Sequence, residues 1–205
     1  MMHIKGVWWP DDVAEKWRHS LQHVRSLEWS LARCARTRTA VQAGGNIGLW
    51  PRRMADVFAR VITFEPDATS CACLLRNTND VAARVDVHCA ALGADTGRCS
   101  IQHRSLGSHQ VIAGDEVPVT TIDALGLTDL DFLQLDIEGY EWHALRGAMV
   151  TIARCRPLIQ LELRGFTEKY GGSDDAVRAL LAGLGYHEVS QQRGNDVVFE
   201  AGPCG

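Results

Sequence analysis

Short apolar runs alternate with stretches of helical periodicity over most of the 205-residue chain. Because strands that alternate with helices form parallel sheets, this order predicts an α/β fold with a mostly parallel sheet. A closing hairpin around Arg193-Gly194-Asn195 would add an antiparallel strand at or near one edge. The runs that predict the earlier strands are residues 39–41, 61–64, 85–89, 132–135 and 158–163. In sheets of this kind, ligands bind at the carboxyl ends of the strands.

The first predicted strand runs into the turn Gly44-Gly45-Asn46-Ile47-Gly48, which precedes a predicted helix. Glycines let a ligand approach the backbone, and the start of a helix offers unpaired N–H groups. Glu65 ends the next predicted strand, 21 positions after Gly44, where a carboxylate accepts the two hydroxyls of a ribose. The turn and the acid together predict a cofactor that contains adenosine.

The spacing of the glycines separates two classes of cofactor. A dinucleotide needs the pattern G-x-G-x-x-G for its pyrophosphate, and glycines at positions 44, 45 and 48 do not match it. S-adenosylmethionine (SAM) has no phosphate, and a G-x-x-x-G turn suffices for it. We therefore expect SAM, and a nicotinamide-dependent oxidoreductase is the disfavoured alternative.

Acidic residues follow the apolar strand in LQLDIEGYEW, residues 133–142. Asp136 and Glu138 are two positions apart, so in a strand their side chains would share a face. Like charges held close raise each other's pKa, which costs stability unless a cation, a proton or a substrate hydroxyl balances them. The stretch therefore predicts the mouth of a site, although Glu138 can equally be an acid at the start of a helix. Glu162 ends the fifth predicted strand at the same edge and would contact substrate or a loop.

Five segments, in their order along the chain, resemble the FkbM-like family of SAM-dependent methyltransferases. They are VQAGGNIG, ITFEPD, VPVTTIDAL, LQLDIEGYEWHALRGA and RPLIQLEL, and the resemblance runs from about Val41 to Phe199. It implies a class I methyltransferase (Rossmann-like) fold, with a seven-stranded, mostly parallel sheet and one antiparallel strand. Residues 39–205 would form the methyltransferase domain, after an N-terminal helical segment, residues 1–38, whose helix starts at Pro10.

The resemblance also implies how SAM would be held. Gly44, Asn46 and Gly48 would bind the methionine part of the cofactor, and Glu65 would bind its ribose. The family usually has Asp at the cofactor-binding position of Gln42, where the carboxylate helps to hold the ammonium group of SAM. Gln42 is therefore a departure from the family pattern at the cofactor.

Gln134 is a second departure, because the family often has Lys at this position. Gln42 ends the first predicted strand, Gln134 lies in the fourth, and the implied fold makes these strands neighbours. We expect that two neutral amides replace an ion pair here, because removing one partner alone would leave a buried charge. Without such compensation, the two changes favour a catalytically degenerate methyltransferase fold that acts as a binding or interaction module.

Methyl transfer to a hydroxyl requires a group that takes the proton of the acceptor. By the resemblance, Asp136 and Glu138 face the methyl group and the acceptor, which is usually a hydroxyl of a sugar, glycan or natural product. Asp136 is the first candidate for the base, Glu138 the second and His109 the third. His109 lies in the polar segment 93–117, which we predict to be a mobile or substrate-facing loop, and a His in such a loop is more often a surface residue than a catalytic one. A divalent cation held by carboxylates would do the same work, although no metal-binding pattern is established.

The composition narrows the choice of partners and compartment. The formal net charge of −4 gives no general attraction to nucleic acid or anionic lipid, so neither partner is expected. No apolar run suits a membrane span, and the start of the sequence has no signal-peptide core, which predicts a cytoplasmic protein. The seven Cys include no C-x-x-C pair and predict buried thiols in a reducing compartment. The expected partner is a small-molecule or glycan acceptor.

Overall fold

The computed structural model describes residues 1–11, 26–105, 108–191 and 196–203. Its centre is a seven-stranded sheet with the strand order β11-β12-β10-β9-β3-β4-β5. The strands are β3 (Thr39–Ala43), β4 (Arg60–Phe64), β5 (Val85–His88), β9 (Leu130–Leu135), β10 (Leu158–Glu162), β11 (Tyr186–Gln191) and β12 (Asp196–Ala201). Strands β10, β9, β3, β4 and β5 pair in parallel, and β12 is antiparallel to both of its neighbours. The predicted sheet, with one antiparallel strand near an edge, is confirmed.

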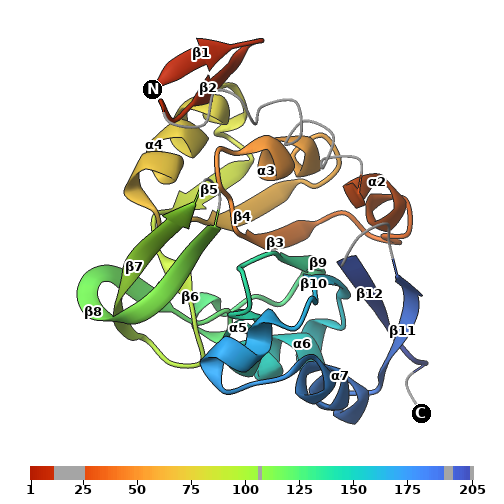
Figure 1. Cartoon of the computed structure of the whole chain (residues 1–205). Coiled ribbons are helices and arrows are strands. Elements are labelled where there is room, and N and C mark those ends of the chain that lie inside the picture. Colours follow the sequence, from red (N-terminus) through yellow and green to blue (C-terminus); the bar gives the residue numbers. More distant parts are fainter. Residues whose placement is uncertain (12–25, 106–107, 192–195, 204–205) are drawn as a thin grey trace.

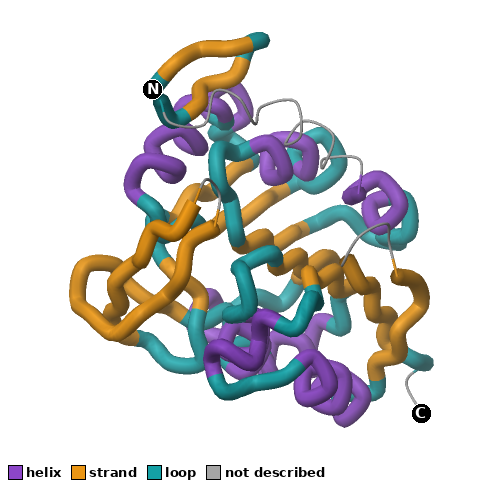
Figure 2. The backbone as a smooth tube through the Cα atoms, viewed as in Figure 1, coloured by secondary structure: helices purple, strands orange, loops and turns teal. Residues whose placement is uncertain are grey.

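Helices cover both faces of this sheet and make three layers (Figure 1). One face carries α2 (Ser26–Leu31), α3 (Leu49–Met54) and α4 (Ala68–Asn77), and the other carries α5 (Glu141–Arg146), α6 (Met149–Cys155) and α7 (Asp174–Gly183). Figure 2 shows the same layers as purple helices above and below the orange strands. Of the helix predicted from Pro10, only the last part, α2, lies within the described residues.

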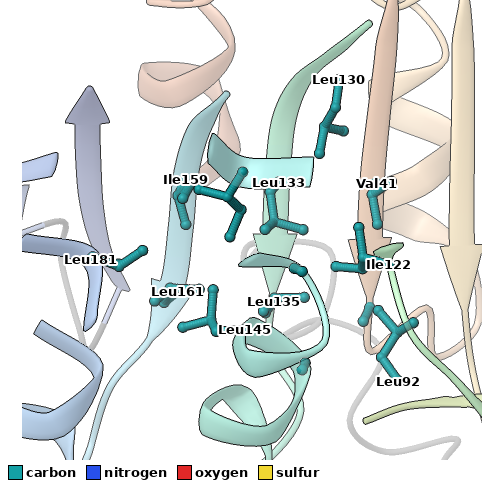
Figure 3. Close-up of a cluster of buried hydrophobic side chains, with 14 of the residues drawn as sticks. Val41, Leu92, Ile122, Leu130, Leu133, Leu135, Leu145, Ile159, Leu161 and Leu181 are labelled. Carbon is teal, nitrogen blue, oxygen red and sulfur yellow. The ribbon is translucent and has the colours of Figure 1, made fainter. Parts of the chain in front are cut away.

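Each face of the sheet has its own apolar cluster, which explains why the central strands are apolar runs without alternation. The larger cluster joins Leu133 of β9 to Leu145 of α5 and Leu181 of α7 (Figure 3). On the opposite face, Phe58 and Phe132 stack with their ring centroids 6.0 Å apart. Burial of one such Leu or Phe side chain stabilises the fold by roughly 1.5–3 kcal/mol. The two clusters hold the sheet rigidly, and its carboxyl edge carries the candidate site.

The segment 93–117, predicted to be a loop, instead belongs to an antiparallel hairpin with one parallel partner (green in Figure 1). Its strands are β6 (Ala91–Leu92), β7 (Gly97–Ser105) and β8 (Ser108–Thr120). The β7–β8 pairing shifts register twice, and Gly114 lies so close to Ser100 that a Cβ on it would be 1.9 Å from the Oγ. Such shifts break the apolar alternation by which strands are recognised, so the sequence suggested a loop.

The helical segment that follows β9 is divided into α5 and α6, which meet around Gly147. A Cβ on Gly147 would lie 2.1 Å from the carbonyl oxygen of Gly93. The chain therefore requires glycine where the β6–β7 connection crosses this helical segment. Two short η helices, η1 (Asn79–Val81) and η2 (Asp123–Leu125), and a longer one, η3 (Phe166–Tyr170), complete the connections.

Cys71 of α4 and Cys89 after β5 form a disulfide, with their Cα atoms 5.8 Å apart. The prediction that all cysteines are thiols is wrong for this pair, because only tertiary packing brings α4 against the end of β5. Four other cysteines are free thiols: Cys34, Cys73, Cys99 and Cys155. The disulfide removes the cysteine argument for a reducing compartment.

A short hairpin that the sequence analysis missed, β1 (Met2–Ile4) and β2 (Val7–Trp9), precedes the helices. Trp9 is buried against Ile47 of the glycine-rich turn. Asn77 donates hydrogen bonds to the carbonyl oxygens of Trp8 (2.8 Å) and Ile47 (2.7 Å), so the hairpin supports that turn. Of the helices in the described residues, none has the length and apolar character for a membrane span.

Candidate cofactor and active site

The glycine-rich turn between β3 and α3 has a backbone that few side chains tolerate. Gly44, Asn46 and Gly48 have φ angles of 83°, 46° and 94°, in the left-handed region. A Cβ on Gly44 would lie 1.9 Å from the backbone oxygen of Asp136, so the end of β9 passes directly against the turn. A pocket of about 100 Å³ lies between them, lined by Gly44, Asn46, Trp50 and Asp136 among others. The predicted cofactor turn and the first catalytic candidate thus share one pocket.

Glu65, at the end of β4, is almost completely buried beside the same turn. Its carboxylate accepts hydrogen bonds from the backbone N–H of Asn46 (2.7 Å) and of Asp67 (2.8 Å). Burial raises the pKa of Glu65 to about 7, against these two hydrogen bonds, which lower it. Each carboxylate oxygen retains a lone pair, so the group can accept ribose hydroxyls while it holds the turn. The ribose assignment stays a prediction.

A cluster of acids and one arginine lies at the carboxyl ends of β9 and β10. Asp136 and Glu162 follow the register partners Leu135 and Leu161, so they lie side by side at the ends of these strands. Arg164 contacts Glu138 (2.8 Å) and Glu162 (3.0 Å). Glu138 and Gly139 have φ angles of 58° and 105°, so the backbone turns sharply here and Glu138 is not in a strand conformation. The structure brings the first two catalytic candidates together and adds Glu162 and Arg164 to them.

Burial, together with the neighbouring Asp136, raises the pKa of Glu162 to about 9. Arg164 acts in the opposite direction on this carboxyl. Burial also raises the pKa of Glu138, while Arg164 lowers it. Acids with raised pKa values at the mouth of a pocket are typical of sites that move protons.

Glu141 is a buried acid that the sequence analysis did not single out. Its carboxylate accepts a hydrogen bond from the backbone N–H of Ile137 at 2.8 Å. Burial raises the pKa of Glu141 to about 8. The bond closes the turn from β9 into α5 and so fixes the backbone that presents Asp136. The available sequence signal was a third acid in D-I-E-G-Y-E, three positions after Glu138.

The third catalytic candidate, His109, lies in β8, opposite His103 in the hairpin. Its catalytic role stays a prediction. Next to the hairpin is a pocket of about 440 Å³, lined by Arg98 and by aromatic side chains of the lower layer. Tyr140 stacks on His143 with ring centroids 4.6 Å apart. The Tyr170 hydroxyl accepts a hydrogen bond from the backbone N–H of Val111 at 3.2 Å, which ties β8 to η3.

The sequence matches the Methyltransferase FkbM domain family over residues 42–188, which is most of the chain. The chain belongs to the FkbM methyltransferase family. The matched residues therefore form a methyltransferase domain of this family. Searches of curated proteins returned no match.

Solved structures agree in fold with this FkbM methyltransferase. The FkbM methyltransferase from Methylobacillus flagellatus KT is 22% identical, with a TM-score of 0.56. The match covers 85% of this chain and 47% of that one, so the chain spans about half the length of that protein. Magnesium protoporphyrin IX methyltransferase from Synechocystis PCC 6803, solved with bound SAM, is 14% identical at a TM-score of 0.56, covering 95% and 85% of the two chains. A ribosomal protein L11 methylase from Lactobacillus delbrueckii subsp. bulgaricus is 7% identical, also at 0.56, covering 97% and 83%.

The residues of this FkbM methyltransferase fit SAM as the cofactor. The close contact of Gly44 with Asp136 leaves a bare backbone, and Glu65 provides acceptors for a ribose beside it. Neither feature offers positive charge to a pyrophosphate. Across the described part of the chain, no group of three or more His, Cys, Asp or Glu side chains is arranged to hold a metal ion.

The two glutamines that depart from the family pattern are side by side. Gln42 and Gln134 are register partners in β3 and β9, as predicted, and Gln160 of β10 continues the row. All three are fully buried. Gln42 donates to the carbonyl oxygen of Ala43 (3.1 Å) and accepts from the Thr63 hydroxyl (2.5 Å). Among the residues that the structure describes, the amides of Gln134 and Gln160 have no hydrogen-bond partner.

Proposed function

We propose that this FkbM methyltransferase transfers the methyl group of SAM to a hydroxyl of a sugar, a glycan or a natural-product-like small molecule. The observation that carries this proposal is the pair of carboxyl groups, Asp136 and Glu162, beside the glycine-rich turn. The pKa of an alcohol lies far above that of a carboxylic acid, so its oxygen attacks well only when a base takes its proton. Asp136 is that base in the proposed reaction.

The protein residues contribute position and proton transfer. SAM supplies a methyl group on a positively charged sulfur, which makes that carbon open to displacement. The turn at Gly44 and the carboxylate of Glu65 orient the cofactor, and the acceptor oxygen must approach in line with the carbon–sulfur bond. Arg164 holds Glu138 and Glu162 in fixed positions around Asp136. A positioned base increases the rate of such a reaction by roughly a hundredfold to ten-thousandfold.

The pocket of about 440 Å³ supports an acceptor of small-molecule size, because ligand pockets are commonly about 300–1,000 Å³. Tyr140 and Tyr170 offer aromatic faces and edges, which pack on the apolar face of a sugar ring. Arg98 and Asp95 line the same pocket and offer hydrogen bonds to hydroxyls.

A binding module without turnover is the second candidate, and Gln42 is the observation that favours it. The usual Asp at this position would present a carboxylate to the ammonium group of SAM. Gln42 instead directs its amide to Ala43 and Thr63 within the sheet. If SAM binding needs the carboxylate that Gln42 replaces, SAM would bind weakly, and the domain would function by binding a partner.

The test is transfer of an isotopically labelled methyl group from SAM to a panel of free sugars, methyl glycosides and polyhydroxylated natural products. We expect a labelled product with the wild type. Asp136→Asn should lose at least about a hundredfold in rate while its SAM affinity stays within about tenfold. Equal activity of the variant would make Asp136 structural. Tight SAM binding with no product from any acceptor would favour the binding module, and calorimetry with NAD serves as the negative control.

A further inference from the structure

Asp136 and Glu162 form a carboxyl pair that is held by the sheet itself. They follow the register partners Leu135 and Leu161 on adjacent parallel strands, so they lie side by side at the carboxyl edge of the sheet. Two carboxylates held side by side repel each other, so the pair is more stable with one proton than with none. Burial and the neighbouring Asp136 raise the pKa of Glu162 to about 9, so Glu162 is the group that keeps this proton.

The surrounding charges favour retention of that proton. Glu138 adds its charge beside Asp136, and the buried Glu141 acts on Asp136 from the start of α5. Two cations face the group: Arg164 bridges Glu138 and Glu162, and Lys169 of η3 acts on Glu138. Asp196 of β12 is the register partner of Glu162 on its other side and adds a further carboxyl group. The cluster thus contains more carboxyl groups than cations, Asp136 and Glu162 included. Partial burial, with the Glu162 side chain 17% exposed, limits the screening of this imbalance by water.

Asp136 also belongs to the cofactor pocket. Its backbone oxygen lies against Gly44, and it lines the same pocket as the glycine-rich turn. The sulfonium of SAM is a permanent cation, whereas the sulfur of the product, S-adenosylhomocysteine (SAH), is neutral. A cation placed near an acid favours its ionised form. The charge state of the pair must then depend on which of the two compounds is bound.

We propose that the Asp136–Glu162 pair keeps its proton when the bound sulfur is neutral and releases it to solvent when the sulfonium of SAM binds. The deprotonated pair is then the base of the reaction. The acceptor O–H bond breaks and its proton goes to the pair, the O–CH3 bond forms, and the electrons of the S–CH3 bond stay on sulfur. At the end the sulfur is neutral and the pair again holds one proton, as it does with SAH. This rests on the proposed role of Asp136 as the base for a hydroxyl acceptor.

The test counts protons during cofactor binding and needs no acceptor, so it is independent of whether an acceptor is found. Binding heats of SAM and SAH are measured by calorimetry near pH 7.5 in buffers of different ionisation enthalpy. We expect about one more proton released per SAM bound than per SAH bound. Both ligands carry the same adenosine, ammonium and carboxylate groups, so a change at Glu65 contributes to both and drops out of the difference. Equal proton counts for SAM and SAH would overturn the proposal.

Sinefungin separates charge from the methyl group, because it carries a protonated amine in place of the sulfonium. It should release the proton as SAM does. Release with SAM but not with sinefungin would show that charge is not the cause, and would contradict the proposal.

Matched variants identify the source of the proton. Glu162→Gln keeps a hydrogen-bond donor to Asp136 but has no proton to lose, so the difference between SAM and SAH should vanish. Glu141→Gln removes the other buried acid of the cluster and should leave the difference in place. The reverse pattern would assign the proton to Glu141 and overturn the proposal. If Glu162→Gln does not fold, infrared difference spectra of the wild type decide. A protonated carboxyl band must disappear with SAM and persist with SAH, and its persistence with both would contradict the pair.

Discussion

At the scale of single residues, Gly44 and Glu65 each have two roles, one in the glycine-rich turn and one in the predicted cofactor site. Gly44 combines a φ of 83° with a backbone contact to Asp136 that a Cβ would close to 1.9 Å. Glu65 has a comparable double role, since it braces the turn through the N–H groups of Asn46 and Asp67 and faces the predicted ribose position. One residue in each case connects the stability of the turn to cofactor binding.

Gly44→Ala should therefore destabilise the protein, by roughly 1–3 kcal/mol for the strained backbone alone and by more for the clash. SAM binding should fall with it, because β9 must move away from the turn. Gly97→Ala is the matched control, since a Cβ on Gly97 meets no atom within 4 Å. Thermal unfolding of both variants checks this, and equal melting temperatures would contradict the close approach.

The glutamine pair allows a test of compensation. Gln42→Asp or Gln134→Lys alone puts one charge into a fully buried position and should cost about 3–5 kcal/mol. The double variant should recover much of the loss, because the two residues are register partners in β3 and β9. A double-mutant cycle from thermal unfolding measures the coupling. Additive effects would show that the positions do not interact, and would favour the degenerate-fold alternative.

At the scale of elements, the parallel strands explain which parts of the site could be predicted from the sequence. Their carboxyl ends meet at one edge, so Glu65 and Asp136 were placed near the glycine-rich turn from sequence alone. Contacts between separate elements could not be foreseen. The position of Asp136 beside Glu162 depends on β9 and β10 being neighbours in register, and the Cys71–Cys89 disulfide depends on how α4 packs. Neither relation leaves a pattern in local sequence.

The hairpin β7–β8 was missed for a related reason, since its register shifts conceal the alternation of a strand. Its anchoring is testable. Tyr170→Phe removes only the hydroxyl that accepts the Val111 N–H, which should weaken local protection by about 1 kcal/mol, or roughly fivefold. Hydrogen exchange of the peptide that contains Val111 measures this. An unchanged exchange rate would mean that other contacts hold the hairpin against η3.

At the scale of the whole molecule, buried acids make stability depend on pH in an unusual direction. Burial raises the pKa values of Glu65, Glu141 and Glu162 from 4.5 to about 7, 8 and 9. Between 4.5 and these values the folded state binds more protons than the unfolded state, so the free energy of unfolding falls as pH rises. Each group that still holds its proton contributes at most roughly 1.4 kcal/mol per pH unit.

We therefore expect the melting temperature to fall between about pH 5 and pH 9. Glu141→Gln should make this fall less steep, because that side chain has no proton to lose. Thermal unfolding across the range measures both curves. A melting temperature that rises from pH 5 to pH 9 would contradict the protonated state of these acids.

From the arrangement of the whole fold, we infer that SAM binds at the carboxyl ends of β3, β4 and β9. Two clusters of apolar residues hold these strands, and the turn at Gly44, the acid Glu65 and the acid Asp136 all project from their ends. The most direct measurement is calorimetry of SAM with the wild type and with Glu65→Ala. Losing charge-assisted hydrogen bonds costs roughly 1.5–3 kcal/mol, so the variant should stay folded and bind SAM about tenfold to a hundredfold more weakly. An unchanged affinity in a folded variant would contradict the site.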